Sequence, residues 1–346
     1  MEIKIVHFEQ KYLGDFYPLA GLVHPKEKGL EARMKWFTFG NPLYADNAKL
    51  PGLAIVFQEK EVIGQFLMAP FEFYLHGKKY RGHFGYDFFV KEEYRSRGAG
   101  ALLFVQGVRM FGPFIGVGLT QVVEKISKAA GIQVIGQIRK FIWTSNPLTL
   151  GTKLLKNKLV GGSDKISDDG AEGRFPETIE LSGLKLVKIS HVSQGLGPSF
   201  SSETLEPART KEFLTWRFAD SPWKYHMYGQ ASGSSDVFLV IRQAYYQGMR
   251  LLLIVDYRFE KENYQQLGTI LQAAKTIARE ARLDGVVMAS TCGVMDEALQ
   301  RERFVGAGRP SSVIGYLPKA DFPLPVHSIG LTMADADLDF SFGEGP

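Results

Sequence analysis

The order of apolar runs in the first 150 residues predicts a mixed sheet. Short runs bounded by turn residues predict strands, whereas apolar residues spaced three and four apart predict helices. Strands are expected at residues 3–8, 53–57, 62–75, 80–90, 114–118 and 132–143, and helices at residues 27–37, 101–111 and 121–130. The early strands are joined by short polar turns, such as the one around Gly77, whereas the later elements alternate between strand and helix. This order predicts a mixed α/β domain in which antiparallel strands come first.

The second half of the chain repeats this order of elements, although not the sequence itself. Strands are expected at residues 184–189, 225–229, 237–246, 250–257, 286–290 and 312–317, and helices at residues 210–218, 264–281 and 296–302. We therefore predict an α/β protein of the α+β type with two copies of one fold. Each copy is expected to be a mixed, mostly antiparallel sheet flanked by helices.

The composition between the two halves sets the predicted domain boundaries. Residues 151–183 are rich in Gly, Ser, Asp and Lys and show no periodicity, which indicates a linker. The first domain is then residues 1–150 and the second residues 184–320. Residues 321–346 form a C-terminal tail that contains Pro, Gly and Asp, and we expect it to be loosely attached.

Charge and cysteine content argue against several classes of function. The 41 basic and 37 acidic residues are spread along the chain and give a net charge of +4, unlike a dedicated nucleic-acid binder. The single cysteine, Cys292, permits no intrachain disulfide and favours a reducing, cytoplasmic compartment. We interpret Cys292 as a buried small side chain rather than a nucleophile, because it follows an apolar strand.

Neither a metal site nor a membrane span is expected. No spacing of Cys and His is typical of a zinc site. The most apolar stretch, residues 99–119, contains Gln106, Arg109 and Pro113, so it is interpreted as a buried helix followed by a strand.

The candidate chemistry lies in residues 88–103, where a strand ends at Val90 and a polar, glycine-containing turn leads into an apolar helix. Backbone N–H groups at the start of a helix point outward, and the helix dipole favours negative charge there. Gly98 and Gly100 lack side chains, so a pyrophosphate can approach the amides closely. Arg95 and Arg97 can add charge-assisted hydrogen bonds. The turn therefore predicts an anion-binding site.

This turn resembles the signature of the GNAT acetyltransferase superfamily, which is Arg/Gln-x-x-Gly-x-Gly/Ala placed after a strand and opening a helix. Arg95, Gly98 and Gly100 match the signature in full, and the order of elements is similar over residues 3–143. The resemblance implies an acyl-CoA-dependent N-acetyltransferase with acetyl-CoA as its cosubstrate. The implied cofactor-binding residues are Phe88, Phe89, Val90, Arg95, Ser96, Arg97, Gly98, Ala99, Gly100 and Ala101.

The resemblance also implies how the reaction proceeds. Pantetheine would insert beside the strand that ends at Val90 and pair with the backbone of Phe88 and Val90. An amine would then attack the thioester directly, without a covalent enzyme intermediate. The amine must lose a proton. Alternation along residues 83–90 places His83, Gly85, Asp87 and Phe89 on one face, so Asp87 and His83 are the candidate general bases.

Alternatives to these roles stay open at the level of the sequence. Asp87 could make a strand-end hydrogen bond, and His83 could be a surface residue near the hairpin. The family's usual acid for the thiolate is a tyrosine, and its position holds Ser127 here. Water or another tyrosine would then protonate the thiolate, the thiolate would leave unprotonated, or the domain would bind CoA without catalysis.

The second domain is expected to lack a cofactor site. The segment that follows its strand at residues 250–257 contains no glycine, so it could not hold a pyrophosphate in the same way. The second domain is expected to shape the acceptor site instead. The resemblance implies that the acceptor is a small-molecule amine, with an amino sugar as one candidate, and a homodimer is left open. A CoA-responsive binding module and a Fem-like aminoacyl transferase are the alternatives, and the complete pyrophosphate turn argues against the latter.

Overall fold

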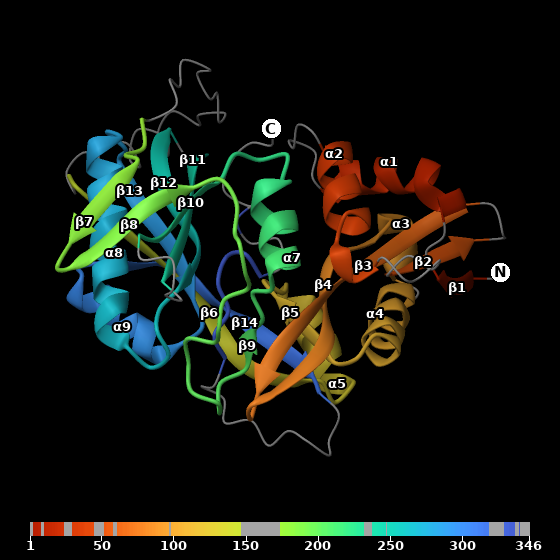
Figure 1. Ribbon diagram of the computed structural model, residues 1–346. Coiled ribbons are helices and arrows are strands. Elements are labelled where there is room, and N and C mark those ends of the chain that lie inside the picture. The colour runs from red at the N-terminus through yellow and green to blue at the C-terminus, as the bar shows by residue number, and fades with distance from the viewer. Residues whose placement is uncertain are drawn as a thin grey trace. The chain divides into compact units, whose positions relative to one another are not determined.

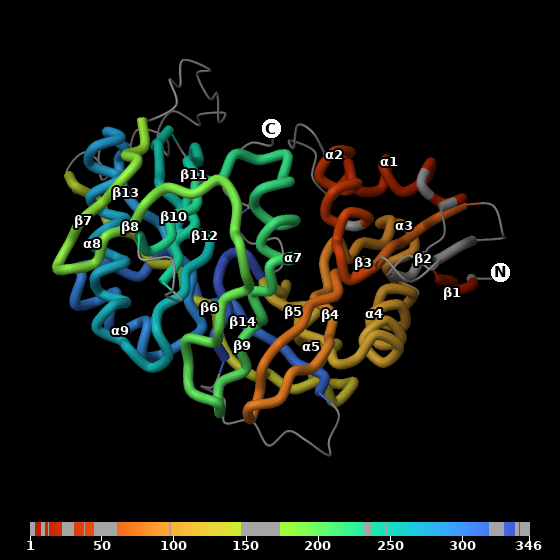
Figure 2. Tube along the Cα trace, in the orientation of Figure 1, coloured from red at the N-terminus to blue at the C-terminus, as the bar shows by residue number. Residues whose placement is uncertain are grey.

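The chain forms two compact units in the computed structural model (Figures 1 and 2). The structure describes residues 3–7, 10–23, 30–44, 52–57, 61–96, 98–146, 174–231, 237–246, 248–317, 329–335 and 339. Unit 1 is built from the described parts of residues 1–138 and 311–329, and unit 2 from those of residues 139–310 and 330–344.

Unit 1 is a mostly antiparallel sheet flanked by helices. Its strands are β1 (Ile3–His7), β2 (Gly52–Phe57), β3 (Glu61–Leu75), β4 (Lys78–Val90), β5 (Phe114–Val117), the first half of β6 (Gln133–Thr144) and the second half of β14 (Val305–Tyr316). They are ordered β1-β2-β3-β4-β5-β14-β6, and β4 and β5 are a parallel pair. The helical segments are η1 (Gln10–Tyr12), α1 (Leu13–Val23), α2 (Leu30–Met34), η2 (Lys35–Phe39), η3 (Pro42–Tyr44), α3 (Glu92–Arg95), α4 (Ala99–Met110) and α5 (Gln121–Ala129).

Local sequence explains several boundaries in unit 1. The β3–β4 hairpin turns at His76 and Gly77, whose φ angles of 49° and 70° are those of the tight turns that suit twisted hairpins. Helix α5 begins where the Thr120 side chain accepts a hydrogen bond from the Val123 amide at 3.4 Å. It ends before Gly131, which has a φ of 75°.

The core of unit 1 lies between the sheet and α4. Phe66 of β3 stacks on Phe104 of α4 with ring centres 5.4 Å apart. Gly107 permits this close packing, because a Cβ atom there would lie 2.7 Å from the Phe66 ring. On the other side of β4, Phe37 of η2 meets Tyr86 edge to face at 4.9 Å. Helix α4 and the α1–η2 segment therefore cover opposite faces of the β3–β4 hairpin (Figure 1).

Unit 2 repeats the pattern of a mostly antiparallel sheet with one parallel pair. Its strands are β7 (Thr178–Leu181), β8 (Leu184–Ile189), β9 (Glu206–Pro207), β10 (His226–Gln230), β11 (Phe238–Tyr246), β12 (Met249–Arg258) and β13 (Gly285–Ser290). The sheet order is β7-β8-β10-β11-β12-β13-β6, and β12 and β13 are parallel. The helical segments are α7 (Lys211–Leu214), η4 (Thr215–Ala219), α8 (Tyr264–Glu280) and α9 (Gly293–Arg301).

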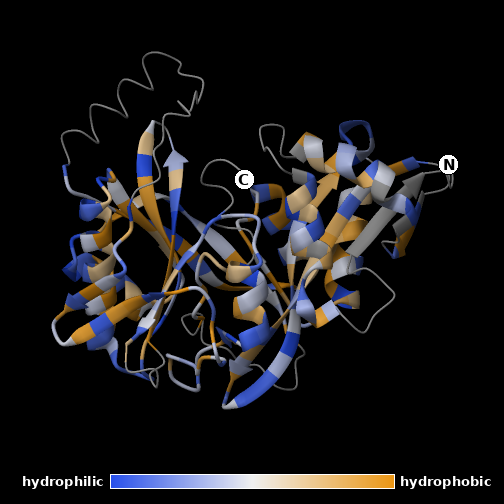
Figure 3. Ribbon diagram, turned by 45° about the horizontal axis from the view of Figure 1, so that its top comes forward, coloured by the Kyte–Doolittle hydropathy of each residue, from blue (hydrophilic) through white to orange (hydrophobic). Residues whose placement is uncertain are grey.

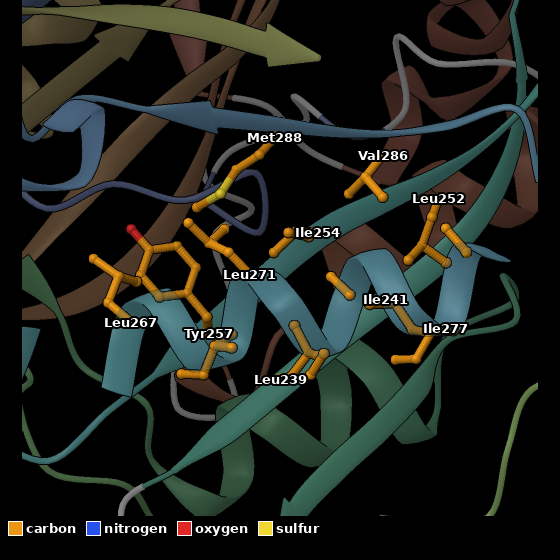
Figure 4. Close-up of a cluster of buried hydrophobic side chains, with 14 of the residues drawn as sticks. Leu239, Ile241, Leu252, Ile254, Tyr257, Leu267, Leu271, Ile277, Val286 and Met288 are labelled. Atoms are coloured by element: carbon orange, nitrogen blue, oxygen red, sulfur yellow. The ribbon is translucent and has the colours of Figure 1, made fainter. Parts of the chain in front are cut away.

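Helix α8 covers the centre of the unit 2 sheet. Its apolar residues Leu267, Leu271 and Ile277 are fully buried. They belong to the same core cluster as strand residues that include Leu239, Ile241, Leu252, Ile254, Val286 and Met288 (Figure 4). The hydropathy pattern agrees with this packing, because the strands are largely hydrophobic whereas the helices alternate hydrophobic and hydrophilic residues (Figure 3).

The structure confirms the α/β class, with mostly antiparallel strands flanked by helices. It differs from the sequence analysis in several places. Helix α1 was not expected, and it carries Pro18 inside an 11-residue helix. Strand β7 lies within the segment predicted as a linker at residues 151–183, whose residues 151–173 are outside the described part. Residues 311–316 of β14 group with unit 1, because β14 pairs with β5 there.

The expectation of a loosely attached tail at residues 321–346 is wrong for its described part. Leu331, Thr332 and Met333 are at most 1% exposed, and Asp335 and Asp339 are also buried. The sequence did not indicate this burial, because polar Thr and Asp residues usually lie at the surface. Here the Asp residues are paired with arginines of unit 2 that are distant in the sequence.

Candidate functional site

The turn between β4 and α4 consists of a short helical turn and a glycine in the left-handed region. After β4 ends at Val90, the single turn α3 leads to Gly98, whose φ is 72°. Gly98 is exposed, and a Cβ atom there would meet nothing within 4 Å. Its carbonyl accepts the first bond of α4, from the Leu102 amide at 3.1 Å. The preceding amides of Ala99, Gly100 and Ala101 thus have no acceptor within the helix, as at every helix start.

Gly100 leaves space beside this helix start. A Cβ atom at Gly100 would lie 3.5 Å from Val90 and 3.7 Å from Phe88, which are ordinary contacts. Glycine is therefore not needed there for the packing of the chain itself. Ala99 is buried, and Ala101 is half-buried. The arrangement fits the close approach of a ligand to the backbone.

Arg95 has a structural role in addition to its charge. Its Nε donates to the Val90 carbonyl at 2.8 Å, and its guanidinium lies 5.2 Å from the centre of the Phe89 ring. This contact fastens the turn to the end of β4 and uses one lone pair of a carbonyl that we expected to pair with pantetheine. Arg95 and Ser96 are both exposed. Arg97, the second predicted cation, lies outside the described residues.

Strands β4 and β5 separate beside this turn. Within the described residues they pair only at His83 with Phe114 and at Phe84 with Ile115. Strand β5 pairs on its other side with β14 over all four of its residues. Strand β4 continues for residues 85–90 without β5. Residues of this stretch, which include Phe88 and Val90, therefore have no β5 partner within the described residues.

A β-bulge lies at the start of this opening. In the pairing of β3 with β4, Gln65 opposes Phe89 and Leu67 opposes Tyr86, so two residues of β4, Asp87 and Phe88, face one residue of β3. Asp87 has a φ of 47°, which is unusual for a residue other than glycine. Bulges of this kind redirect side chains and backbone groups near functional sites.

The bulge places the two candidate bases on opposite faces of the sheet. His83 packs toward α4, with its Nδ1 atom 2.7 Å from the carbonyl oxygen of Phe111 at the end of that helix. Asp87 faces the other side, where its Oδ2 atom lies 3.7 Å from Arg33 of α2. The expectation that His83, Gly85, Asp87 and Phe89 share one face is therefore wrong, because the bulge shifts the alternation by one residue.

Arg33 and Gln65 are buried polar residues that the sequence analysis missed. The side chains of Arg33 and Asp87 are both 1% exposed. Gln65 is fully buried, and neither its amide nitrogen nor its carbonyl oxygen has a hydrogen bond within the described chain. Gln65 shares the α2 side of β3, since its neighbour Phe66 packs on α4. The only available signal was a polar residue inside an otherwise apolar run.

His83 is a neutral histidine with one defined hydrogen bond. Since a carbonyl oxygen can only accept, Nδ1 donates its proton to Phe111, and Nε2 keeps the lone pair. Burial lowers the pKa of His83 to about 4, although the bond to Phe111 opposes the shift. His83 is thus a half-buried residue with a defined partner, unlike the alternative of a surface residue.

The lowered pKa of His83 predicts acid sensitivity. The pKa of histidine in an unfolded chain is about 6.5, so the unfolded chain binds more protons between pH 6.5 and pH 4. We expect the free energy of unfolding to fall by up to about 3 kcal/mol across that range because of His83. In urea denaturation, His83→Gln should lose this component, whereas a variant of the exposed His191 should keep it. Identical pH profiles for wild type and His83→Gln would contradict the assignment.

Ser127, at the position of the family's tyrosine, is buried and donates to the Val123 carbonyl at 2.7 Å, so it is committed to its own helix. No group of three or more potential metal ligands occurs among the described residues. No helix in the described part of the chain is long and apolar enough to cross a membrane.

No protein-family model matches the sequence, and no curated protein matches it. The fold, in contrast, is similar to those of solved structures. A GCN5-related N-acetyltransferase from Anabaena variabilis superposes with a TM-score of 0.57 and 12% identity, over 90% of this chain and 72% of that one. A probable N-acyltransferase of unknown function from Enterococcus faecalis V583 has a TM-score of 0.55 and 10% identity, with 92% and 72% covered.

A third similar structure is the N-myristoyltransferase of Saccharomyces cerevisiae with bound myristoyl-CoA. It has a TM-score of 0.54 and 13% identity, and the match covers 95% of this chain and 89% of that one. At such low identities the likeness concerns the fold alone. It agrees with the resemblance of the β4–α4 turn, so this chain has the fold of the GCN5-related N-acetyltransferases.

Proposed function

We propose that this protein is an acyl-CoA-dependent N-acyltransferase that transfers an acetyl group to an amine of a small molecule. The observation that carries the proposal is the separation of β4 from β5 directly beside the glycine turn. An opening between parallel strands suits an extended pantetheine chain, and the start of α4 suits a pyrophosphate. The solved N-myristoyltransferase with the same fold binds an acyl-CoA, which supports this class of cosubstrate.

The residues of unit 1 would have separate roles in binding and positioning acetyl-CoA. The amides of Ala99, Gly100 and Ala101 hold the pyrophosphate, and Arg95 fixes the turn. Backbone groups of the bulge at Asp87 and Phe88 orient the chain that lies in the opening. Acetyl-CoA supplies the activated acyl group. The protein supplies position and a proton acceptor for the attacking amine.

Asp87 is the favoured proton acceptor. It belongs to the part of β4 that has no β5 partner, whereas His83 still pairs with Phe114 of β5. Arg33 beside it balances the charge of the carboxylate on the face opposite α4. The buried amide of Gln65, which has no hydrogen bond within the described chain, lies on the same side of the sheet as Asp87 and would be available to a bound amine.

Replacing Asp87 by asparagine tests this role with little disturbance of the backbone, because asparagine also adopts positive φ angles. We expect kcat to fall about 100-fold with the KM for acetyl-CoA nearly unchanged. His83→Gln is the matched variant on the other face, and its kcat should stay within about threefold of wild type. The reverse ranking in steady-state kinetics would transfer the role to His83.

A CoA-responsive binding module is the second candidate. It is favoured by Ser127, which is buried and bonded within α5 at the position where the family carries its acid. Thermal denaturation with acetyl-CoA, followed by an assay for released thiol across a set of amines, separates the two. Stabilisation without thiol release on any amine would favour the module.

We further propose that unit 2 is a second copy of the fold that has lost its cofactor site. Its β12–α8 connection contains no glycine, and Arg258, the last residue of β12, is buried against Glu206 at 3.3 Å. A loop built in this way offers no close approach to the backbone for a pyrophosphate.

A further inference from the structure

Unit 2 has an opening between parallel strands that corresponds to the opening in unit 1. Strands β12 and β13 pair from Leu251 with Gly285 to Ile254 with Met288, and β12 then continues to Arg258. A bulge follows the last pair here too, because the register of β11 with β12 skips Val255. Strands β4 and β12 thus share the same order of features, which is a parallel pair, a bulge and a strand end that keeps only its antiparallel partner.

In unit 2 this opening is filled by the chain's own C-terminal segment, residues 330–335. The Ala334 amide donates to the carbonyl of the bulge residue Val255 at 2.9 Å. The Leu331 amide donates at 2.9 Å to the side chain of Thr291, which follows β13. The Gly330 amide donates to the Leu205 carbonyl at 2.8 Å. The segment is therefore bonded to the ends of both separated strands.

Side chains of the segment are recognised as specifically as its backbone. The Thr332 hydroxyl donates to Asp256 of β12 at 2.9 Å. Asp335 lies 2.9 Å from Arg209, and both side chains are at most 1% exposed. Gly330 packs on the Phe200 ring so closely that a Cβ atom would lie 2.7 Å from it.

A second anchor lies a few residues further along. Arg217 donates to the Ala334 carbonyl at 3.2 Å and to Asp339 at 2.6 Å. The Tyr225 hydroxyl donates to the other oxygen of Asp339, also at 2.6 Å. Buried ion pairs of this kind fix one register of the bound segment, because any shift would leave a buried charge unpaired.

We propose that the C-terminal segment is a built-in peptide ligand of unit 2, which occupies the position that acyl-CoA takes in unit 1. The comparison with unit 1 rests on the proposed function, whereas the occupancy of the groove does not. The site selects a peptide that turns at residues 333–335, where the Asp335 amide donates to the Thr332 carbonyl at 3.2 Å. It requires glycine at the Phe200 contact, a hydroxyl at Asp256 and a carboxylate at Arg209. Unit 2 then cannot take a second acyl-CoA, and the chain binds one.

The test displaces the segment without altering the groove. Gly330→Val clashes with Phe200, and the change lies in the segment itself. A fluorescent synthetic peptide of residues 330–346 should then bind the full-length variant with micromolar affinity in fluorescence anisotropy, whereas wild type should bind none. Changing Thr332 to Val and Asp335 to Asn in the peptide should weaken binding at least about 30-fold, equivalent to about 2 kcal/mol. Gly306→Val is the matched control, because a Cβ atom at Gly306 meets nothing within 4 Å.

If Gly330→Val does not fold, hydrogen exchange of the wild-type protein tests the same proposal. The amides of Leu331 and Ala334 should exchange through a local opening, at least about tenfold faster than the slowest amides of β12. Exchange of both sets at one rate would make the segment an inseparable part of the core and overturn the proposal. A folded Gly330→Val variant that binds no peptide would also overturn it. Neither experiment involves acetyl-CoA, so failure of the proposed function would be seen separately.

Discussion

Replacing Gly98 by valine should lower the affinity for acetyl-CoA at least about 100-fold, equivalent to about 2.7 kcal/mol. Gly98 has a φ of 72°, which a β-branched residue adopts only with strain. Relief of that strain would rotate the peptide groups that open α4 and misdirect their amides. The new side chain would also enter the space that is open around Gly98. Isothermal titration with acetyl-CoA measures the effect directly.

Gly131 provides a closely matched control for this experiment. It has a φ of 75°, and a Cβ atom there would also meet nothing within 4 Å. It ends α5 rather than opening α4, so Gly131→Val should carry a similar backbone cost and leave the binding of acetyl-CoA nearly unchanged. Equal losses in both variants would mean that strain alone explains the effect. Absence of binding to folded wild-type protein would refute the proposed cosubstrate.

The sequence predicted the parts of the fold that depend on local pattern. Strand β8 and helix α8 match their expected ranges closely. Apolar alternation is compatible only with a strand, and a long amphipathic face only with a helix. The glycine turn was also predicted from local sequence, because the φ of 72° at Gly98 favours glycine whatever its surroundings. Helix α1 was missed because Pro18 argues locally against a helix.

The features that depend on distant partners could not be predicted. The bulge at Asp87 arises from the pairing of β4 with β3, and no residue pattern within residues 83–90 predicts it. Its effect is large, because a shift of one residue transfers Asp87 to the other face of the sheet. The burial of residues 331–335 likewise depends on Arg209 and Asp256, which are far away in the sequence. Charged residues in a tail indicate solvent exposure until their partners are known.

Replacing Arg209 by methionine should destabilise unit 2 by about 3–5 kcal/mol. Arg209 is fully buried and donates from Nε and Nη2 to the two carboxylate oxygens of Asp256, at 2.6 and 3.0 Å. It also pairs with Asp335. Methionine fills much of the volume but leaves two buried carboxylates without their main cation. The exposed pair of Arg301 and Glu297 provides the control, and Arg301→Met should change stability by no more than about 0.5 kcal/mol.

The pH dependence of that loss distinguishes charge from packing. Burial alone would raise the pKa of Asp256, but Arg209 and Arg258 outweigh it and hold the pKa below the usual value of 3.8. A carboxylate with a lowered folded pKa contributes stability above its unfolded pKa, and the contribution is lost as the pH falls through the folded pKa. The difference between wild type and Arg209→Met should therefore be largest at pH 7 and shrink toward pH 3 in urea denaturation. A difference that stays constant between those pH values would assign the loss to packing, and the buried carboxylates would then contribute little to holding the C-terminal segment.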